Sequence, residues 1–148
     1  MPDETALLIA DVLEAAGALR RLGEQTAAAE GLTQARWQLL SAVSEDPLTA
    51  PQAARRLGVS RQNVQRVAND LVSLRLATYE ANPDHRGSPL LAPTPSGREA
   101  LARVTARATD LNRTLFAAVP AEEISATRAS LRRLLTELDR HEGTEGKR

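Results

Sequence analysis

The sequence predicts a mainly α-helical fold with one small β-hairpin, and three observations support this. Apolar residues recur at steps of three and four over most of the chain, which is the period of amphipathic helices. Turn-forming residues gather in one long segment, 82–89, between two short runs that can form strands. The chain has 148 residues and no cysteine, so a single domain can bury a core without disulfides.

The first part of the chain predicts two helices. Residues 5–29 are rich in alanine and carry one apolar stripe, and Gly31 ends that helix. Thr33 is the predicted N-cap of a second helix, which Pro47 ends because proline cannot continue a helix. The stripe is Leu8, Val12, Ala15, Leu19 and Leu22, and the inward positions of the second helix are Trp37, Leu40 and Val43. We expect Trp37 to pack in the core.

Two short helices joined by a tight turn are predicted over residues 49–75. Thr49 and Gln52 have the spacing of a capping box, and Gly58 suits the positive φ that ends a helix. Ser60 then caps a helix whose inward positions are Val64, Val67, Leu71 and Leu74. Both a helix-turn-helix and an ordinary helical hairpin have this form.

A hairpin and two longer helices complete the chain. Residues 77–81 and 90–92 can form strands around the turn 82–89, so the helix pair is followed by a wing with a polar, cationic tip. The predicted winged helix-turn-helix spans residues 33–93. Thr94 and Pro95 then begin a helix to about Val119, and a last helix after Pro120 carries Ile124, Leu131, Leu134 and Leu138. Residues 143–148 predict a disordered tail.

The exposed face of the helix after Ser60 carries side chains suited to duplex DNA. Arginine can pair bidentately with guanine, and asparagine and glutamine with adenine. Ser60 can offer its hydroxyl and the helix N-terminal amides to a phosphate. Between Ser60 and Asp70 this helix has no acidic residue, whereas a merely solvated helix face usually mixes Glu and Lys. The composition of the face therefore favours DNA contact. The other candidate residues are Arg61, Gln62, Asn63, Gln65, Arg66 and Asn69.

The wing offers three further candidates. Arg86 can enter a minor groove, where negative potential is concentrated. Asp84 can either orient the Arg86 guanidinium or merely shape the turn, and His85 can touch phosphate or lie in solvent. Although the net charge is zero, residues 51–98 carry seven Arg against three acidic residues, a net +4. Such a basic middle fits a phosphate partner, or an arginine-rich solvated face.

Catalytic and metal sites are not predicted. The chain has no cysteine and only two histidines, far apart, which argues against a metal cluster or a Cys/His nucleophile. No glycine-rich phosphate loop occurs either. The acidic start lacks the pattern of a signal peptide, and no apolar run is long enough for a membrane span. We therefore expect a cytoplasmic protein that is not an enzyme and has no cofactor, metal ion or membrane partner.

Three stretches in combination resemble the MarR family. They are LGVSRQNVQRVANDL at residues 57–71, NPDHR at 82–86 and TPSGR at 94–98, and the resemblance extends over residues 5–141. Two features depart from the family pattern. Arg75 stands where the family often has glycine, and the Arg86-to-Thr94 spacing is one residue longer than the commonest form.

The resemblance implies a single domain, residues 1–148, that dimerises through its ends. Residues 5–30 and 120–141, with part of 95–119, would be the dimerisation helices. Such a homodimer would bind a pseudo-palindromic operator as a repressor and respond to a small aromatic or anionic effector, for which no binding residues are predicted. The alternative is a protein-interaction module that keeps the winged fold without binding an operator. That module should tolerate acidic and apolar residues on the face that here carries Arg, Gln and Asn.

Overall fold

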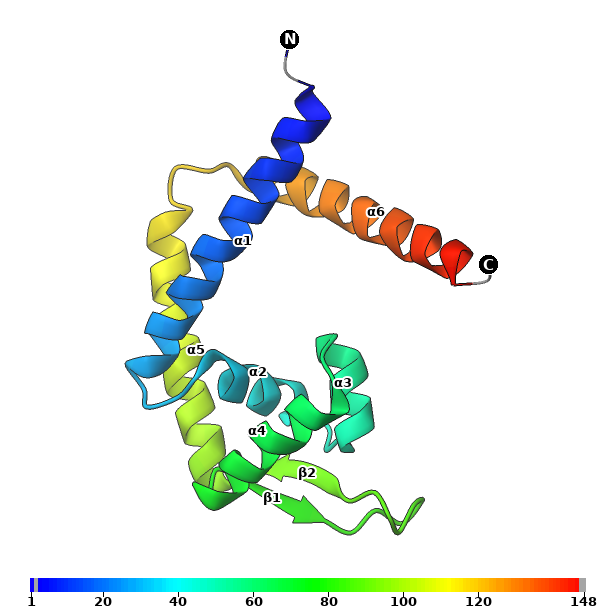
Figure 1. The fold of residues 1–148 in the computed structure, drawn as a ribbon. Coiled ribbons are helices and arrows are strands. Elements are labelled where there is room, and N and C mark those ends of the chain that lie inside the picture. Colours follow the sequence, from blue (N-terminus) through cyan, green and yellow to red (C-terminus); the bar gives the residue numbers. More distant parts are fainter. Residues whose placement is uncertain (2, 147–148) are drawn as a thin grey trace. The chain divides into compact units, whose positions relative to one another are not determined.

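The computed structural model describes residue 1 and residues 3–146, and this part of the chain contains six helices and a two-stranded antiparallel sheet (Figure 1). The mainly α-helical prediction with one β-hairpin is confirmed. The chain divides into two compact units, Met1–Thr109 and Asp110–Arg148. The elements are α1 (Glu4–Ala28), α2 (Gln34–Val43), α3 (Ala50–Leu57), α4 (Arg61–Ser73), β1 (Ala77–Glu80), β2 (Leu90–Pro93), α5 (Pro95–Leu115) and α6 (Ala121–Glu145).

The core of the first unit lies where α2, α4 and α5 pack together beside the hairpin. Its largest fully buried side chains are Leu39, Leu40, Val43, Leu71 and Val104. Trp37 is partly buried and packs against this core, as the sequence predicted. Ala27 at the end of α1 is also fully buried, so this end of the helix is anchored in the core.

The predicted helix caps are all present. Thr33 Oγ accepts a hydrogen bond from Arg36 N at 3.2 Å, and Ser60 Oγ accepts one from Asn63 N at 3.1 Å. Thr49 and Gln52 form the reciprocal capping box. Gly58 has φ of 68°, the left-handed conformation that glycine adopts without a steric penalty. These local signals fix the two short helices and the turn between them.

The apolar stripe of α1 is only partly covered within the chain. Leu8 and Leu19 are more than half exposed, with relative exposures of 53% and 56%. Towards the end of α1, Leu22 is half-buried. Glu30, two residues after the helix ends, forms ion pairs with Arg103 and Arg107 of α5 at 3.3 and 3.0 Å. The last turn of α1 is therefore buried in the core through Ala27, whereas its first half presents leucines to solvent.

Leu74 is not an inward position, which corrects the sequence prediction. Its side chain is 49% exposed because α4 ends at Ser73 and the chain then turns. Arg75 provides that turn with φ of 61°, the only positive φ outside glycine in the described residues. After this turn the chain returns to the core at Leu76, which is partly buried.

The two long C-terminal helices differ from the prediction at their ends. Helix α5 ends at Leu115 rather than near Val119, and residues 116–119 form a turn in which Val119 N donates to Phe116 O at 3.0 Å. Helix α6 continues to Glu145, so residues 143–145 are helical and do not form the start of a disordered tail. Gly143 costs about 1 kcal/mol in a helix, but extending an existing helix needs no new nucleus. Residues 147–148 of the expected tail lie outside the described residues.

The base of the hairpin is tied to the start of α5. Thr94 N donates to Leu76 O at 3.1 Å, and Thr94 Oγ donates to Arg75 O at 2.7 Å. The same hydroxyl oxygen accepts from Gly97 N at 3.1 Å, which makes Thr94 the predicted N-cap of α5. Gly97 is buried so close to Leu76 that a Cβ there would overlap the Leu76 carbonyl oxygen. The turn after α4 and the first turn of α5 are thus one packed junction.

A third backbone segment joins the hairpin at Leu48. Leu48 N donates to Leu91 O at 3.2 Å, and Leu91 N donates to Leu48 O at 2.7 Å. This isolated bridge lies immediately before α3, so the second strand of the hairpin is bonded to the entry of the helix pair.

No helix in the described part of the chain is long and apolar enough to cross a membrane.

Replacing Arg75 by glycine is expected to stabilise the protein. A non-glycine residue in the left-handed conformation costs about 1 kcal/mol or more, which glycine avoids. Because glycine also gains entropy in the unfolded state, the net increase in the free energy of unfolding should be about 0.5–1 kcal/mol. Guanidinium denaturation at fixed protein concentration measures it. Gly31→Ala, which places a Cβ at φ of 72° with open space around it, is the matched control and should lose stability. A less stable Arg75→Gly variant would contradict this account.

Candidate nucleic-acid interface

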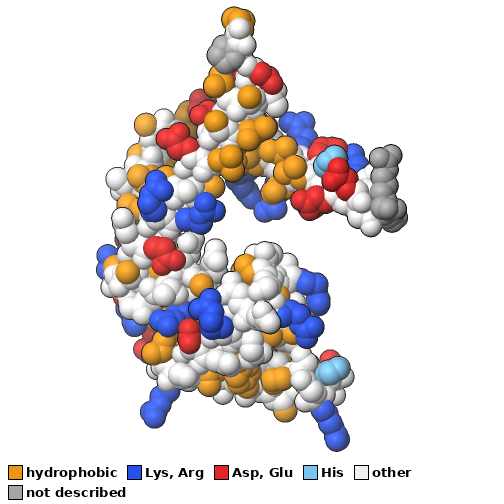
Figure 2. All heavy atoms as spheres, viewed as in Figure 1, with side chains coloured by type: hydrophobic (Ala, Val, Ile, Leu, Met, Phe, Trp, Pro, Cys, Tyr) orange, Lys and Arg blue, Asp and Glu red, His pale blue; other side chains and the backbone are white. Residues whose placement is uncertain are grey.

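Helices α3 and α4 form a helix-turn-helix that leaves one face of α4 exposed. Ala53 and Ala54 of α3 and Val64, Val67 and Ala68 of α4 are buried in the same core cluster. The small alanine side chains allow the two helices to approach closely, while the opposite face of α4 remains in solvent. Figure 2 shows basic side chains over the part of the first unit that contains α3, α4 and the hairpin.

The exposed face of α4 carries the residues that the sequence singled out. Arg61, Gln62, Gln65, Arg66 and Asn69 are exposed, and Asn63 is half-buried. Arg66 Nη2 donates to Asn63 Oδ1 at 2.9 Å, so this guanidinium is held along the helix in the free protein. Ser60 is exposed, but its hydroxyl oxygen is already engaged as the N-cap of α4.

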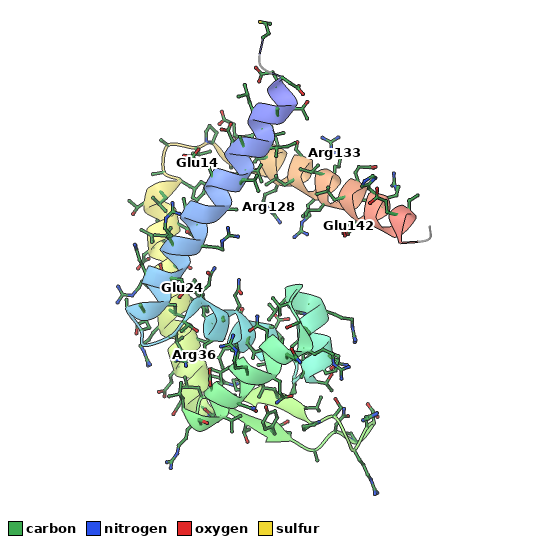
Figure 3. The ribbon with its side chains drawn as sticks, viewed as in Figure 1. Glu14, Glu24, Arg36, Arg128, Arg133 and Glu142 are labelled. Atoms are coloured by element: carbon green, nitrogen blue, oxygen red, sulfur yellow. The ribbon has the colours of Figure 1, made fainter. Side chains whose placement is uncertain are left out.

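Asp70, the first acidic residue of α4, forms an ion pair with an arginine of another helix. Asp70 Oδ2 lies 3.5 Å from Arg36 Nη2, and Arg36 comes from α2 (Figure 3). Because Asp70 is half-buried and compensated by a cation, it adds little negative potential to the exposed face. The face from Arg61 to Asn69 therefore combines positive charge with amide donors and acceptors, which is what phosphate and base edges require.

Tyr79 of β1 belongs to this face, although it was not among the predicted site residues. Its hydroxyl accepts a hydrogen bond from Gln65 Nε2 at 2.7 Å and donates one to Asn69 Oδ1 at 2.8 Å. Gln65 Nε2 also donates to Asn69 Oδ1 at 3.1 Å. Strand alternation places Tyr79 on the same face as the buried Ala77, but the sequence does not indicate which helix that face meets.

The wing turn is organised by Asn82. Asn82 Oδ1 accepts from Asp84 N at 3.1 Å, and Asn82 Nδ2 donates across the turn to Ser88 O at 3.0 Å. Asp84, His85 and Arg86 are all exposed. Within the described residues no salt bridge joins Asp84 to Arg86, so of the two roles considered for Asp84 the orienting pair is not formed here.

Two grooves lie between α4 and the wing turn. One of about 290 Å³ is lined by Arg61, Gln62 and Gln65 on one side and by residues 87–89 on the other. A more open neighbouring groove is lined by Arg55 and Arg61 together with Asp84 and His85. The structure thus brings the start of α4 and the wing turn to one surface. Arg55, in the last turn of α3, also lines this surface and was not among the residues predicted from the sequence.

Potential metal ligands and histidines are not brought together in the described part of the chain. Among these residues no group of three His, Cys, Asp or Glu side chains is placed to hold a metal ion. The two histidines lie in different units, His85 in the wing turn and His141 in α6. The arrangement is therefore one of positive charge, amides and hydroxyls on a surface, which suits binding to an anionic polymer.

Comparisons with known proteins agree with this geometry. Residues 30–86 match the MarR family. An uncharacterized protein of Mycobacterium tuberculosis strain H37Rv is 60% identical over 138 residues, which is 93% of this chain and 96% of the relative.

Two solved structures extend the likeness to the whole fold. A cysteine-to-serine mutant of MarR from E. coli, complexed with operator DNA, has a TM-score of 0.79 at 20% identity and covers 89% of this chain and 96% of its own. CouR from Rhodococcus jostii, bound to p-coumaroyl-CoA, has a TM-score of 0.75 at 19% identity and covers 89% and 92%. At these identities the likeness shows the fold.

Proposed function

Since the chain belongs to the MarR family of winged-helix transcriptional regulators, whose members are not enzymes, we propose that it recognises a specific sequence in duplex DNA. The observation that carries the proposal is the exposed face of α4. It presents Arg61, Gln62, Gln65, Arg66 and Asn69 without an uncompensated acidic group. Arginine and amide side chains are the groups that read base edges in the major groove, and Ser60 and Arg55 are suited to the flanking phosphates.

The DNA-binding form that we propose is a homodimer. Support comes from apolar side chains exposed on α1, among them Leu7, Leu8, Ile9, Leu13 and Leu19, and on α6, namely Leu134, Leu135 and Leu138 (Figure 2). Fully burying an exposed leucine contributes about 1.5–3 kcal/mol. These side chains are 38% to 67% exposed, so a second copy would add part of that for each, and several together favour association. Two recognition helices would then address half-sites about one helical turn apart, ~34 Å.

The regulatory role that we propose is repression controlled by a small molecule. The dimer would exclude other proteins from promoter DNA in the cytoplasm. A small aromatic or anionic effector, by analogy with CouR and its p-coumaroyl-CoA ligand, would release it. For that to occur the effector must bind the conformation that cannot engage DNA more tightly than the one that can.

Fluorescence anisotropy tests DNA binding directly. The duplex immediately upstream of the protein's own gene is labelled and titrated with the wild-type chain at several salt concentrations, with excess unrelated duplex as competitor. We expect tight binding that survives the competitor, with a stoichiometry of two chains per site and a steep loss of affinity with salt. If selection from a randomised duplex library also enriches no sequence, the protein is an interaction module rather than a sequence-specific regulator.

Removing the wing arginine should weaken binding without changing the fold. Arg86→Ala is expected to cost about 1–3 kcal/mol of binding free energy per groove contact, because the exposed guanidinium is free to enter the minor groove. Anisotropy against the selected site measures the loss. Arg113→Ala, which removes an exposed arginine from α5, is the charge-matched control. Equal affinities of wild type and Arg86→Ala at low salt would show that the wing does not contact DNA.

A further inference from the structure

The hydrogen-bonded triad of Gln65, Asn69 and Tyr79 links the wing to the recognition helix. Gln65 and Asn69 are four residues apart on α4 and so lie on one helix face. Tyr79 reaches them from β1 because strand side chains alternate and Ala77, two residues earlier, is buried beneath α4. Residues from two elements therefore meet at the exposed face that the proposed function assigns to base recognition.

The triad consumes particular hydrogen-bonding groups. Gln65 Nε2 donates to the Tyr79 hydroxyl at 2.7 Å and to Asn69 Oδ1 at 3.1 Å, so this nitrogen already has two partners within the protein. Asn69 Oδ1 receives a second bond from the Tyr79 hydroxyl at 2.8 Å. What remains for an incoming ligand is one acceptor, Gln65 Oε1, and one donor group, Asn69 Nδ2. The triad thus engages the amide nitrogen of Gln65 and the amide oxygen of Asn69, and it leaves the other polar atom of each amide for a ligand.

This arrangement changes how the two amides can read DNA. A bidentate pair with adenine requires an amide to offer its oxygen to N6 and its nitrogen to N7 together. The triad competes with such a pair, because Gln65 Nε2 and Asn69 Oδ1 each already have two partners within the protein. Gln65 Oε1 can accept from the exocyclic amine of adenine or of cytosine alike, and Asn69 Nδ2 can donate to O6 or N7 of guanine or to O4 of thymine.

We propose that Tyr79 is a positioning residue that sets the base preference of the recognition helix. Its hydroxyl holds Gln65 as an acceptor and Asn69 as a donor, so that the position under Gln65 admits adenine and cytosine and does not select adenine alone. The inference rests on the DNA binding proposed above and concerns which sequence is read, not whether DNA is bound.

Removing the hydroxyl should therefore sharpen the preference for adenine. In Tyr79→Phe, Gln65 Nε2 loses its hydroxyl partner, and the Gln65 amide can turn to pair bidentately with adenine. We expect the adenine-to-cytosine ratio at one base pair of each half-site to rise about fivefold to tenfold, the worth of one net hydrogen bond. Affinity for unrelated duplex should not change, since no charge is altered.

The test is competitive selection from a randomised duplex library with wild type, Tyr79→Phe and Thr78→Val. Thr78→Val removes a hydroxyl from the adjacent β1 residue without touching the triad, so its base spectrum should equal that of wild type. Thermal melting of all three variants verifies that the fold is retained. A purely structural role of Tyr79 would lower affinity evenly for all sequences and would not shift one position.

Two results would overturn the inference, and they are distinguishable. If wild type enriches a sequence but Tyr79→Phe enriches the same one with the same base ratios at every position, the triad does not set the preference and the proposed function stands. If wild type enriches no sequence, the proposed function fails, and the role of Tyr79 fails with it.

Discussion

Gly97→Ala is expected to lower the free energy of unfolding by about 2–3 kcal/mol, although alanine is the better helix former. The propensity term favours alanine by about 1 kcal/mol in a helix interior. Against it stands the Leu76 carbonyl oxygen, which a Cβ at residue 97 would overlap. Relief requires moving backbone that Thr94 binds through Leu76 O and Arg75 O, so the steric cost exceeds the propensity gain.

Gly17→Ala is the matched control for that experiment. Gly17 lies inside α1, and a Cβ there would meet only the end of the Arg21 side chain at an ordinary 3.5 Å. The same substitution should therefore raise stability by about 0.5–1 kcal/mol. Both variants are measured by guanidinium denaturation at one protein concentration, because the stability of the proposed dimer would depend on concentration. A Gly97→Ala variant as stable as Gly17→Ala would show that the junction at the base of the wing can adjust freely.

Arg66→Ala is expected to abolish sequence-specific binding while leaving binding to unrelated duplex largely intact. A bidentate arginine–guanine pair is worth about 1–3 kcal/mol, and a dimer loses two of them, which is about 2–6 kcal/mol in total. The Arg66 bond to Asn63 Oδ1 in the free protein holds the guanidinium close to the helix start, which lowers the entropy lost on binding. Anisotropy with the selected site and with unrelated duplex measures both affinities.

Arg66→Lys separates the two roles that an arginine can play. Lysine keeps the charge but lacks the planar fork, so specific affinity should fall nearly as far as in Arg66→Ala while the salt dependence stays that of wild type. Arg113→Ala, on the exposed side of α5, should change neither. Unchanged specific affinity in Arg66→Ala would show that the recognition face has been misassigned.

Local signals in the sequence were sufficient to predict most of the fold. Caps at Thr33, Thr49 and Ser60, and the positive φ of Gly58, each depend on residues within a few positions of one another. The exposed face of α4 was predictable for the same reason, because helical periodicity assigns its two sides. Leu74 was misplaced because the same periodicity was carried one residue past the end of the helix.

Features that depend on pairing between distant segments were not predictable in this way. Tyr79 reaches α4 only because the hairpin folds beneath that helix, and Arg55 joins the wing groove only through the packing of α3. The close approach of Gly97 to Leu76 likewise spans about twenty residues of chain. Each involves an interaction whose geometry follows from tertiary structure rather than from spacing along one element.

The backbone bridge between Leu48 and Leu91 bears on how recognition parts could be exchanged between related proteins. The bridge bonds β2 to the residue just before α3, so the wing and the helix pair are packed as one piece. A chimera that takes only α4 from a relative would combine that helix with a wing that packs against a different α4. An exchange of residues 48–97 keeps the bridge, the Tyr79 triad and the Thr94 junction together in one cassette. We therefore expect residues 48–97, rather than α4 alone, to be the segment that transfers the proposed DNA specificity from one relative to another.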